Sequence, residues 1–282
     1  MIFKAAMSQT AFMLKKRESL CVFYVLFFMV LHNFIGNVLY FQGLDILVMK
    51  QPMQLLLLSH LRTNLNSSNT LMLIQLYPIL VVIPAGFSLA REYQRGTRVF
   101  LVSRLGNSVY QISKYLAVFF TTMIIFTVPF LLEILLNCVS FPLSAMGDLL
   151  YSSRSTESAY IEGINHYFMK EAYLYSPYLY AVLGTLFWGA GAGLLSVFTA
   201  ALSSLIRVKY NVFLFLPVFA LLNLPLLLGH GIPRGMPSIK WYDYMLLFND
   251  EVKSMGFLTN VIIVLVLFAA GTVWINRRKD CL

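Results

Sequence analysis

Six apolar segments, each close to the length that crosses a lipid bilayer, constrain the fold of this chain more than any other feature. They lie at about residues 20–42, 71–90, 115–138, 177–204, 211–230 and 256–276. A transmembrane helix needs about 20 apolar residues. The chain is 59% hydrophobic and 12% charged, against about 25% charged residues in soluble domains. The sequence therefore predicts an all-α membrane protein with six transmembrane helices, folded as a single domain over residues 1–282.

The basic residues predict which side of the membrane each loop faces. With six spans, the N-terminus, residues 91–114, the 205–210 turn and the C-terminal tail lie on one side and carry 14 of the 21 Lys and Arg residues. Because cytoplasmic loops are enriched in Lys and Arg, we expect a multi-pass protein of the plasma (inner, cytoplasmic) membrane with both termini in the cytoplasm. The net charge of +9 then follows from topology, and no nucleic acid partner is needed.

Segments outside the six spans carry patterns of their own. In residues 1–19, apolar or small residues recur at helical spacing: Ile2, Phe3, Ala6, Thr10, Met13 and Leu14. This spacing predicts an amphipathic helix at the inner membrane interface, with a frayed N-terminus as the alternative. Residues 139–176 and 231–255 are long enough to form two outer elements beyond simple connections. The apolar run at 54–58 is too short to span and is predicted to lie in the membrane interface.

A basic segment between the second and third spans has its own helix start and stop signals. Thr97 can cap a short helix over 98–105, and Gly106 can end it. Ser108-Val-Tyr-Gln111 then has the pattern of a capping box for the next helix. These signals predict a short cytoplasmic helix, with an ordinary positive-inside loop as the alternative. The apolar residues that this helix would present are Val99, Phe100 and Val102.

Polar side chains inside the predicted spans are few. Glu133 is the only acid within a span. An intramembrane carboxylate is by default a proton or cation site, but its distance from the start of the span also fits an interfacial carboxylate at the outer headgroups. On the first span, Asn33 and Asn37 share one helix face and His32 lies on another, so this helix faces another helix or a pathway rather than lipid. The candidate pathway residues are His32, Asn33, Asn37 and Glu133, with polar packing as the alternative role.

The chain shows no catalytic or metal-binding motif. It has no HExxH, no GxSxG and no clustered carboxylates, and its four histidines lack ligand spacing such as HxxxH. It also lacks GxxxxGK[ST], so it has no P-loop of its own for ATP. We therefore expect no enzyme activity, no metal site and no cofactor on this chain.

The fourth span carries a packing signal, and three other spans carry kink signals. Gly189-Ala-Gly-Ala-Gly193 matches the small-xxx-small pattern that lets membrane helices approach closely. Prolines are expected to kink the second, third and fifth spans: Pro78 and Pro84, Pro129, and Pro217 and Pro225. Kinked helices suit a protein that changes shape, but they are also common in rigid bundles.

The order of these features resembles the type-2 ABC exporter permeases. The shared features are an N-terminal interfacial helix, six spans, a basic segment after the second span and an outer element before the sixth. The sharpest match is Glu92-Tyr-Gln-Arg-Gly-Thr97, followed by an apolar turn, Ser103-Arg104, and Lys114 at the start of the third span. The family often has a proline in the turn where this chain has Leu105-Gly106-Asn107. The resemblance in architecture covers nearly the whole chain.

The resemblance implies a permease subunit that works with a second permease, identical or related, and with two separate P-loop ATPase subunits that hold ATP and Mg. Residues 97–106 would form the coupling helix, which docks in a groove of the ATPase. The cargo path would run between the two permeases, within the membrane lipid, lined mainly by spans one, two and five. Family cargoes are peptides, lipids, glycolipids and drugs, and an apolar lining favours amphipathic cargo. The residues implied in coupling are Glu92, Gly96, Thr97, Val99, Phe100, Val102, Arg104 and Lys114.

Two other functions remain open from the sequence. An ion-coupled secondary transporter predicts inverted repeats and buried charges at the membrane midplane, and the chain shows neither repeats nor a clearly central acid. A non-transporting membrane protein with an immunity or sensory role would also tolerate the lack of chemistry. Such a protein would not need a capped apolar helix in the cytoplasm.

Overall fold

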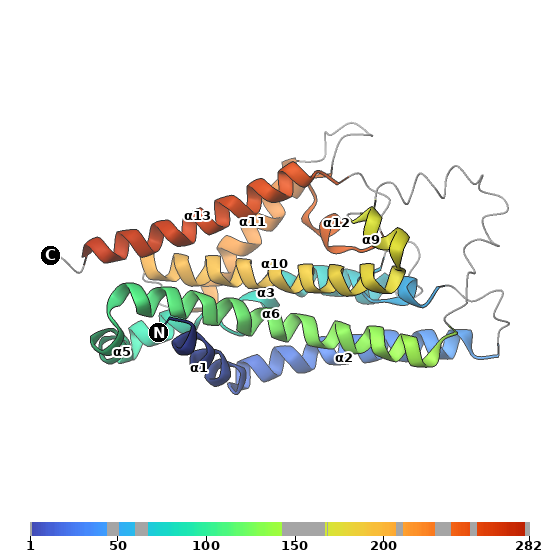
Figure 1. Ribbon diagram of the computed structural model, residues 1–282, viewed down its shortest axis with the longest axis horizontal. Coiled ribbons are helices and arrows are strands. Elements are labelled where there is room, and N and C mark those ends of the chain that lie inside the picture. Colours follow the sequence, from blue (N-terminus) through green and yellow to red (C-terminus); the bar gives the residue numbers. More distant parts are fainter. Residues whose placement is uncertain are drawn as a thin grey trace.

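The computed structural model describes residues 2–43, 51–59, 67–142, 167, 169–206, 211–228, 238–248 and 253–279. All regular secondary structure in these ranges is helical, which confirms the predicted all-α class. α2, α6 and α10 run roughly along one direction, and α13 is inclined across them (Figure 1). The main helices are α1 Ile2–Leu14, α2 Arg17–Phe41, α3 Ser67–Val82, α4 Ser88–Gln94, α5 Thr97–Leu105, α6 Asn107–Ser140, α10 Pro177–Leu205, α11 Phe215–Leu228 and α13 Met255–Lys279. The short helices are η2 Pro52–Leu55, α9 Lys170–Tyr175, η4 Asn211–Leu214 and α12 Trp241–Met245.

Four of the described helices, α2, α6, α10 and α13, are long and apolar enough to cross a membrane. They correspond to the first, third, fourth and sixth predicted spans. α3 and α11 are apolar but have only 16 and 14 residues. At a rise of about 1.5 Å per residue, α3 extends about 24 Å, which is less than the roughly 30 Å of a hydrocarbon core. The count of six spans therefore stays a prediction.

Prolines explain why the second predicted span, residues 71–90, is divided in the structure. α3 tolerates Pro78 in its interior but ends at Val82, two residues before Pro84. Residues 83–87 form turns, and the helical path resumes as α4 at Ser88. Proline lacks an N–H group and disfavours helical geometry at the residue before it. By contrast, α6 contains Pro129 and still runs as one helix of 34 residues.

Gly189 and Gly193 let α10 pack directly against α6. A Cβ atom at Gly189 would lie 2.0 Å from Thr127 Oγ1, and one at Gly193 would lie 2.9 Å from the carbonyl oxygen of Phe119. Gly191, between them, faces open space. The predicted small-residue packing face is therefore confirmed, and its partner is the third predicted span.

The N-terminal helix predicted over residues 1–19 is present but shorter. α1 ends at Leu14, and α2 begins at Arg17. α1 lies against α6 and buries Ala6, Thr10 and Met13. Phe3, which belongs to the same predicted face, is 63% exposed, so the predicted apolar face packs on α6 only in part.

Residues 52–59 lie inside the helix bundle. Every residue from Pro52 to Ser59 is buried, and the leucines among them belong to the cores formed with the long helices. The backbone N–H of Leu247 donates to the carbonyl oxygen of Leu58 at 2.8 Å. This position differs from the predicted interfacial one because helices, and not lipid, enclose the leucine side chains.

The two predicted outer elements, residues 139–176 and 231–255, are described only in part. Residues 143–166, 168, 231–237 and 249–252 lie outside the described residues. In the described parts, α9 and α12 are short helices, and Tyr173 and Met245 from them are buried in the main core. Both helices therefore belong to the packed body of the protein.

Candidate functional site

The residues that the resemblance assigns to coupling lie on two short helices, α4 and α5, and on the start of α6. Gly96 follows α4 in a left-handed conformation with φ of +69°, and α5 begins at Thr97. A second left-handed glycine, Gly106 with φ of +77°, ends α5, and α6 starts at Asn107. Only glycine adopts such φ values readily. The two glycines therefore form the sharp turns at both ends of α5 (Figure 1).

The two side-chain caps predicted for this segment are wrong. Thr97 is the first residue of α5, and its N-cap is Gly96, which offers no side-chain hydrogen bond. Ser108 and Gln111 form no capping box, because Gly106 is the N-cap of α6 and Ser108 already lies inside that helix. In both places a glycine is the N-cap, so the residue whose side chain would cap the helix already lies inside it.

α5 lies on the surface of the protein. None of its residues is buried, and Val99 and Phe100 are 70% and 73% exposed. Thr97 and Arg104 are exposed too, and Val102 is half-buried. Adjacent large apolar residues on an exposed helix, with basic residues beside them, are typical of a surface that docks on a partner.

Glu92 and Lys114 form an ion pair that joins α4 to α6. The second carboxylate oxygen of Glu92 accepts a hydrogen bond from the hydroxyl group of Tyr110. Lys114 is only 2% exposed, and Tyr110 is fully buried. Tyr110 and Lys114 are four residues apart on one face of α6, so they hold the carboxylate together. Two residues assigned to coupling by the resemblance therefore meet in the structure, and Tyr110 joins them.

α4 and α5 are also bonded to helices on both sides. Arg91 of α4 forms an ion pair with Glu18 at the start of α2. Arg98 of α5 donates from Nη2 to Asn107 Oδ1 at 3.0 Å. Asn107 in turn donates from Nδ2 to the carbonyl oxygen of Asn276 in α13 at 3.3 Å. α5 is therefore bonded directly to α6, and its neighbours α4 and α6 connect it to α2 and α13.

Three of the four candidate pathway residues surround the buried segment 52–59. Asn33 and Asn37 both donate from Nδ2 to the carbonyl oxygen of Leu55, at 3.0 and 2.8 Å. Glu133, which is 1% exposed, accepts on Oε1 from Asn33 Nδ2 at 2.7 Å and from the N–H of Leu57 at 2.8 Å. These side chains satisfy backbone groups that would otherwise be buried without partners. Their observed role is to hold the segment in place.

Two further residues of this polar set are not singled out by the sequence pattern. Asn137 donates from Nδ2 to the carbonyl oxygen of Pro52 at 3.2 Å, and Thr70 Oγ1 donates to that of Leu57 at 3.0 Å. Asn137 lies four residues after Glu133 on α6, so helical spacing identifies it as a residue on the same face. No comparable signal marks Thr70.

His32 does not join the polar set around 52–59. Its side chain is exposed, and Nδ1 lies 2.9 Å from Asn69 Nδ2. The prediction that His32 occupies a different face of α2 from Asn33 and Asn37 is therefore confirmed. A helix turns about 100° per residue, which directs neighbouring residues to different surroundings.

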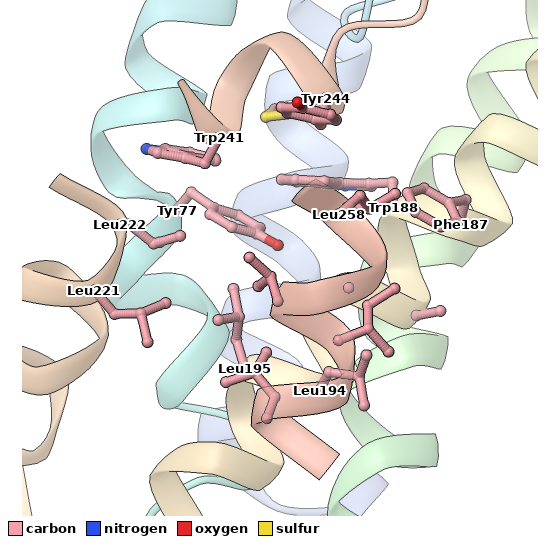
Figure 2. A pocket seen from close by; sticks show the side chains of 16 residues that line it. Tyr77, Phe187, Trp188, Leu194, Leu195, Leu221, Leu222, Trp241, Tyr244 and Leu258 are labelled. Carbon is pink, nitrogen blue, oxygen red and sulfur yellow. The ribbon is translucent and has the colours of Figure 1, made fainter. Parts of the chain in front are cut away.

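An apolar pocket of about 180 Å³ lies between α3, α10, α11, α12 and α13 (Figure 2). Tyr77 of α3 stacks between two indole rings, with its ring centroid 4.1 Å from that of Trp188 and 4.9 Å from that of Trp241. Leucines such as Leu195 and Leu221 line it below these rings (Figure 2). The lining suits an apolar group rather than an ion, and none of the four candidate pathway residues contributes to it.

No protein-family model, curated protein or solved structure matches this chain. Its class therefore follows from its own sequence and structure. The described residues form an all-helical protein with four helices long and apolar enough to span a membrane. In the same residues, no group of three or more His, Cys, Asp or Glu side chains is placed to hold a metal ion.

Proposed function

We propose that this protein is the membrane-spanning permease subunit of an ATP-driven exporter of the type-2 ABC class. It works with a second permease, identical or related, and with two separate P-loop ATPase subunits that hold ATP and Mg. The proposal rests on the exposure of helix α5. This short helix exposes Val99 and Phe100, while the helices on either side of it are bonded to the body of the protein.

Helix α5 has the properties of a docking helix. Val99 and Phe100 can anchor it, and the exposed Arg95 and Arg104 give it a basic rim. Amphipathic helices of this kind bind by placing apolar side chains in a hydrophobic groove of the partner. Residues 97–106 would then be the coupling helix, and a groove on the ATPase would receive it.

A movement of α5 can be transmitted to the long helices. The Glu92–Lys114 ion pair connects α4 to α6, and the Arg91–Glu18 ion pair connects α4 to α2. α6 is continuous over 34 residues, so a displacement of its first turn is carried along the helix. ATP-driven closure of the ATPase pair would in this way shift α2 and α6.

The proposed topology has six spans with both termini in the cytoplasm. α3 with α4 would provide the second crossing, and η4 with α11 the fifth, beside the four long helices. α5 and the end of α13 lie at one end of the bundle, near the bond from Asn107 to Asn276 (Figure 1). The basic residues of α4, α5 and the start of α6 belong to this end, as does Arg277 next to Asn276, which supports a cytoplasmic position in the plasma membrane.

The cargo class that fits these surfaces is amphipathic: a peptide, lipid, glycolipid or drug moved out of the cytoplasm. The pocket around Tyr77, Trp188 and Trp241 is apolar and lies between helices. Asn37 and Glu133 are engaged with the backbone of residues 55–57, which favours an apolar cargo over an ion.

The proposal is tested by purifying the tagged protein from its native membrane in mild detergent and identifying what accompanies it. We expect a soluble P-loop ATPase in near-equal amount. Phe100→Asp should remove the ATPase from the purified complex while membrane insertion is kept, and Phe100→Leu, which keeps an apolar anchor, should retain it. Recovery of the protein without an ATPase, or an equal amount of ATPase with Phe100→Asp, would overturn the assignment.

A further inference from the structure

A cleft of about 530 Å³ lies between α1, the start of α2, α4 and α5. Its four basic residues are Lys16, Arg17, Arg91 and Arg95. Its two acids are already paired, Glu18 with Arg91 and Glu92 with Lys114. Among the described residues no carboxylate pairs with the remaining three cations, so the cleft holds an excess of positive charge.

Two helix starts meet at this cleft. Lys16 is the N-cap of α2 and Gly96 is the N-cap of α5, and neither provides a side-chain hydrogen bond to its helix. The first N–H groups of a helix lack intrahelical acceptors, and helix N-termini attract anions. Lys16 and Arg17 are cations at the start of a helix, and Glu18 in the first turn offsets only part of this charge because it is paired with Arg91. An anion in the cleft would reduce the positive charge at both helix starts.

A buried hydroxyl group points to a ligand independently of the charges. Ser88 lines the cleft and is 5% exposed, and its Oγ has no hydrogen-bond partner among the described residues. Buried hydroxyl groups normally have one. Lys16 gives a related indication, because burial and then repulsion by Lys114 lower the pKa of its ammonium group.

We propose that this cleft binds the phosphate group of an anionic phospholipid. The phosphate oxygens would accept hydrogen bonds from the guanidinium groups of Arg17 and Arg95, from the ammonium group of Lys16 and from the hydroxyl group of Ser88. Guanidinium groups match phosphate oxygens with two parallel hydrogen bonds. The bound phosphate would also offset the positive charge that remains in the cleft after Glu18 and Glu92 have formed their ion pairs.

The place of the cleft favours a lipid headgroup over free phosphate. Arg17 starts α2, a helix apolar enough to cross a membrane, so the cleft opens where such a helix reaches the polar surface of the bilayer. Phe12 and Leu101 also line it and can contact the carbon atoms next to a headgroup. Basic pockets beside the cytoplasmic ends of transmembrane helices are suited to anionic headgroups.

A bound lipid would join α5 to the first two helices, because Thr97 and Leu101 of α5 line the same cleft as Lys16 and Arg17. The lipid site would exist whether or not the protein couples to an ATPase. A failure of lipid binding and a failure of ATPase binding are therefore separate results.

The test measures lipid binding to the purified full-length protein by native mass spectrometry, with phosphatidylglycerol and phosphatidylcholine added in graded amounts. The test variant is Arg17→Gln with Arg95→Gln. The control variant is Lys4→Gln with Arg104→Gln, which removes two exposed basic charges outside the cleft. At about 1 kcal/mol for each basic residue, the test variant should bind phosphatidylglycerol about 30-fold more weakly, and the control should change less than about threefold.

Ser88→Ala keeps every charge and should also weaken phosphatidylglycerol binding severalfold, which separates the cleft from general attraction to a basic surface. Equal losses in the test and control variants would overturn the proposal. Equal binding of phosphatidylglycerol and phosphatidylcholine by the wild-type protein would do the same. Displacement of the lipid by millimolar inorganic phosphate, at matched ionic strength, would assign the cleft to soluble phosphate and overturn the lipid assignment.

Discussion

Removing Glu92 should destabilise the protein far more than removing its partner Lys114. Lys114 is almost completely buried, and Glu92 is its ion-pair partner, with 19% of the Glu92 side chain exposed. Glu92→Leu leaves a buried ammonium group without its carboxylate and leaves the hydroxyl group of Tyr110 without its acceptor. In Lys114→Met, the carboxylate of Glu92 keeps the hydrogen bond from Tyr110 and some contact with water.

The expected magnitudes follow from this asymmetry. Breaking a buried ion pair by removing one partner costs about 3–5 kcal/mol, and the partial exposure of Glu92 places the cost of Glu92→Leu at the lower end, about 3 kcal/mol. Lys114→Met should cost about 1–2 kcal/mol, because the carboxylate left behind remains partly solvated. Replacing both residues removes both charges, and such replacements are often nearly neutral. The double variant still leaves the hydroxyl group of Tyr110 without its acceptor, so it should cost about 1 kcal/mol and be about 2 kcal/mol more stable than Glu92→Leu.

The assay is thermal unfolding of the purified protein in detergent, followed by tryptophan fluorescence. A destabilisation of about 3 kcal/mol corresponds to a fall in Tm of about 6–12 °C for a chain of this size. If the protein is the proposed permease, the double variant should regain most of its Tm but not the stimulation of ATPase activity by cargo. The ion pair would then be needed for coupling and not only for folding.

Two results would refute the reasoning. One is a Tm for Glu92→Leu within about 3 °C of wild type, which would mean that Lys114 does not depend on this carboxylate. The other is a double variant that unfolds as early as Glu92→Leu alone, which would mean that the loss comes from packing or from the unpaired hydroxyl group of Tyr110 rather than from an uncompensated charge.

Two further predictions concern packing inside the bundle. Gly189→Ala should destabilise the protein by about 1–3 kcal/mol, because its Cβ atom would lie 2.0 Å from Thr127 Oγ1. Gly191→Ala, which meets open space, is the matched control, and equal Tm values for the two would contradict the helix contact. Glu133→Leu should cost about 1–3 kcal/mol by leaving the N–H of Leu57 without its acceptor. Glu133→Gln keeps an acceptor oxygen and should cost less; a Tm as low as that of Glu133→Leu would exclude this role.

Much of the helical organisation is predictable because it depends on local periodicity. The apolar runs that become α2, α6, α10 and α13 are long, and the spacing of Gly189 and Gly193 marks a face that only close helix packing needs. The short helix that ends at Gly106 is also predictable, since a glycine there stops it. The predicted caps at Thr97 and Ser108 failed because a local motif does not show which residue takes the left-handed conformation.

The candidate site depends on contacts that no local pattern contains. Glu92 and Lys114 are 22 positions apart, and their pairing follows from the way α4 folds back onto α6. Glu133 and Leu57 are 76 positions apart, and their contact exists because a short apolar run enters the bundle instead of lying at the membrane surface.

The sequence by itself determined the class of this protein, its long helices and the end of α5 at Gly106, because apolar length, helical spacing and the helix-ending preference of glycine act over a few residues. The tertiary structure alone decided that residues 52–59 are buried, that Asn137 and Thr70 hold them, and that Lys16, Arg17, Ser88 and Arg95 line one cleft. The physical reason is that buried polar groups and charges must find partners wherever the packed helices supply them. Those partners come from segments that are distant in the chain.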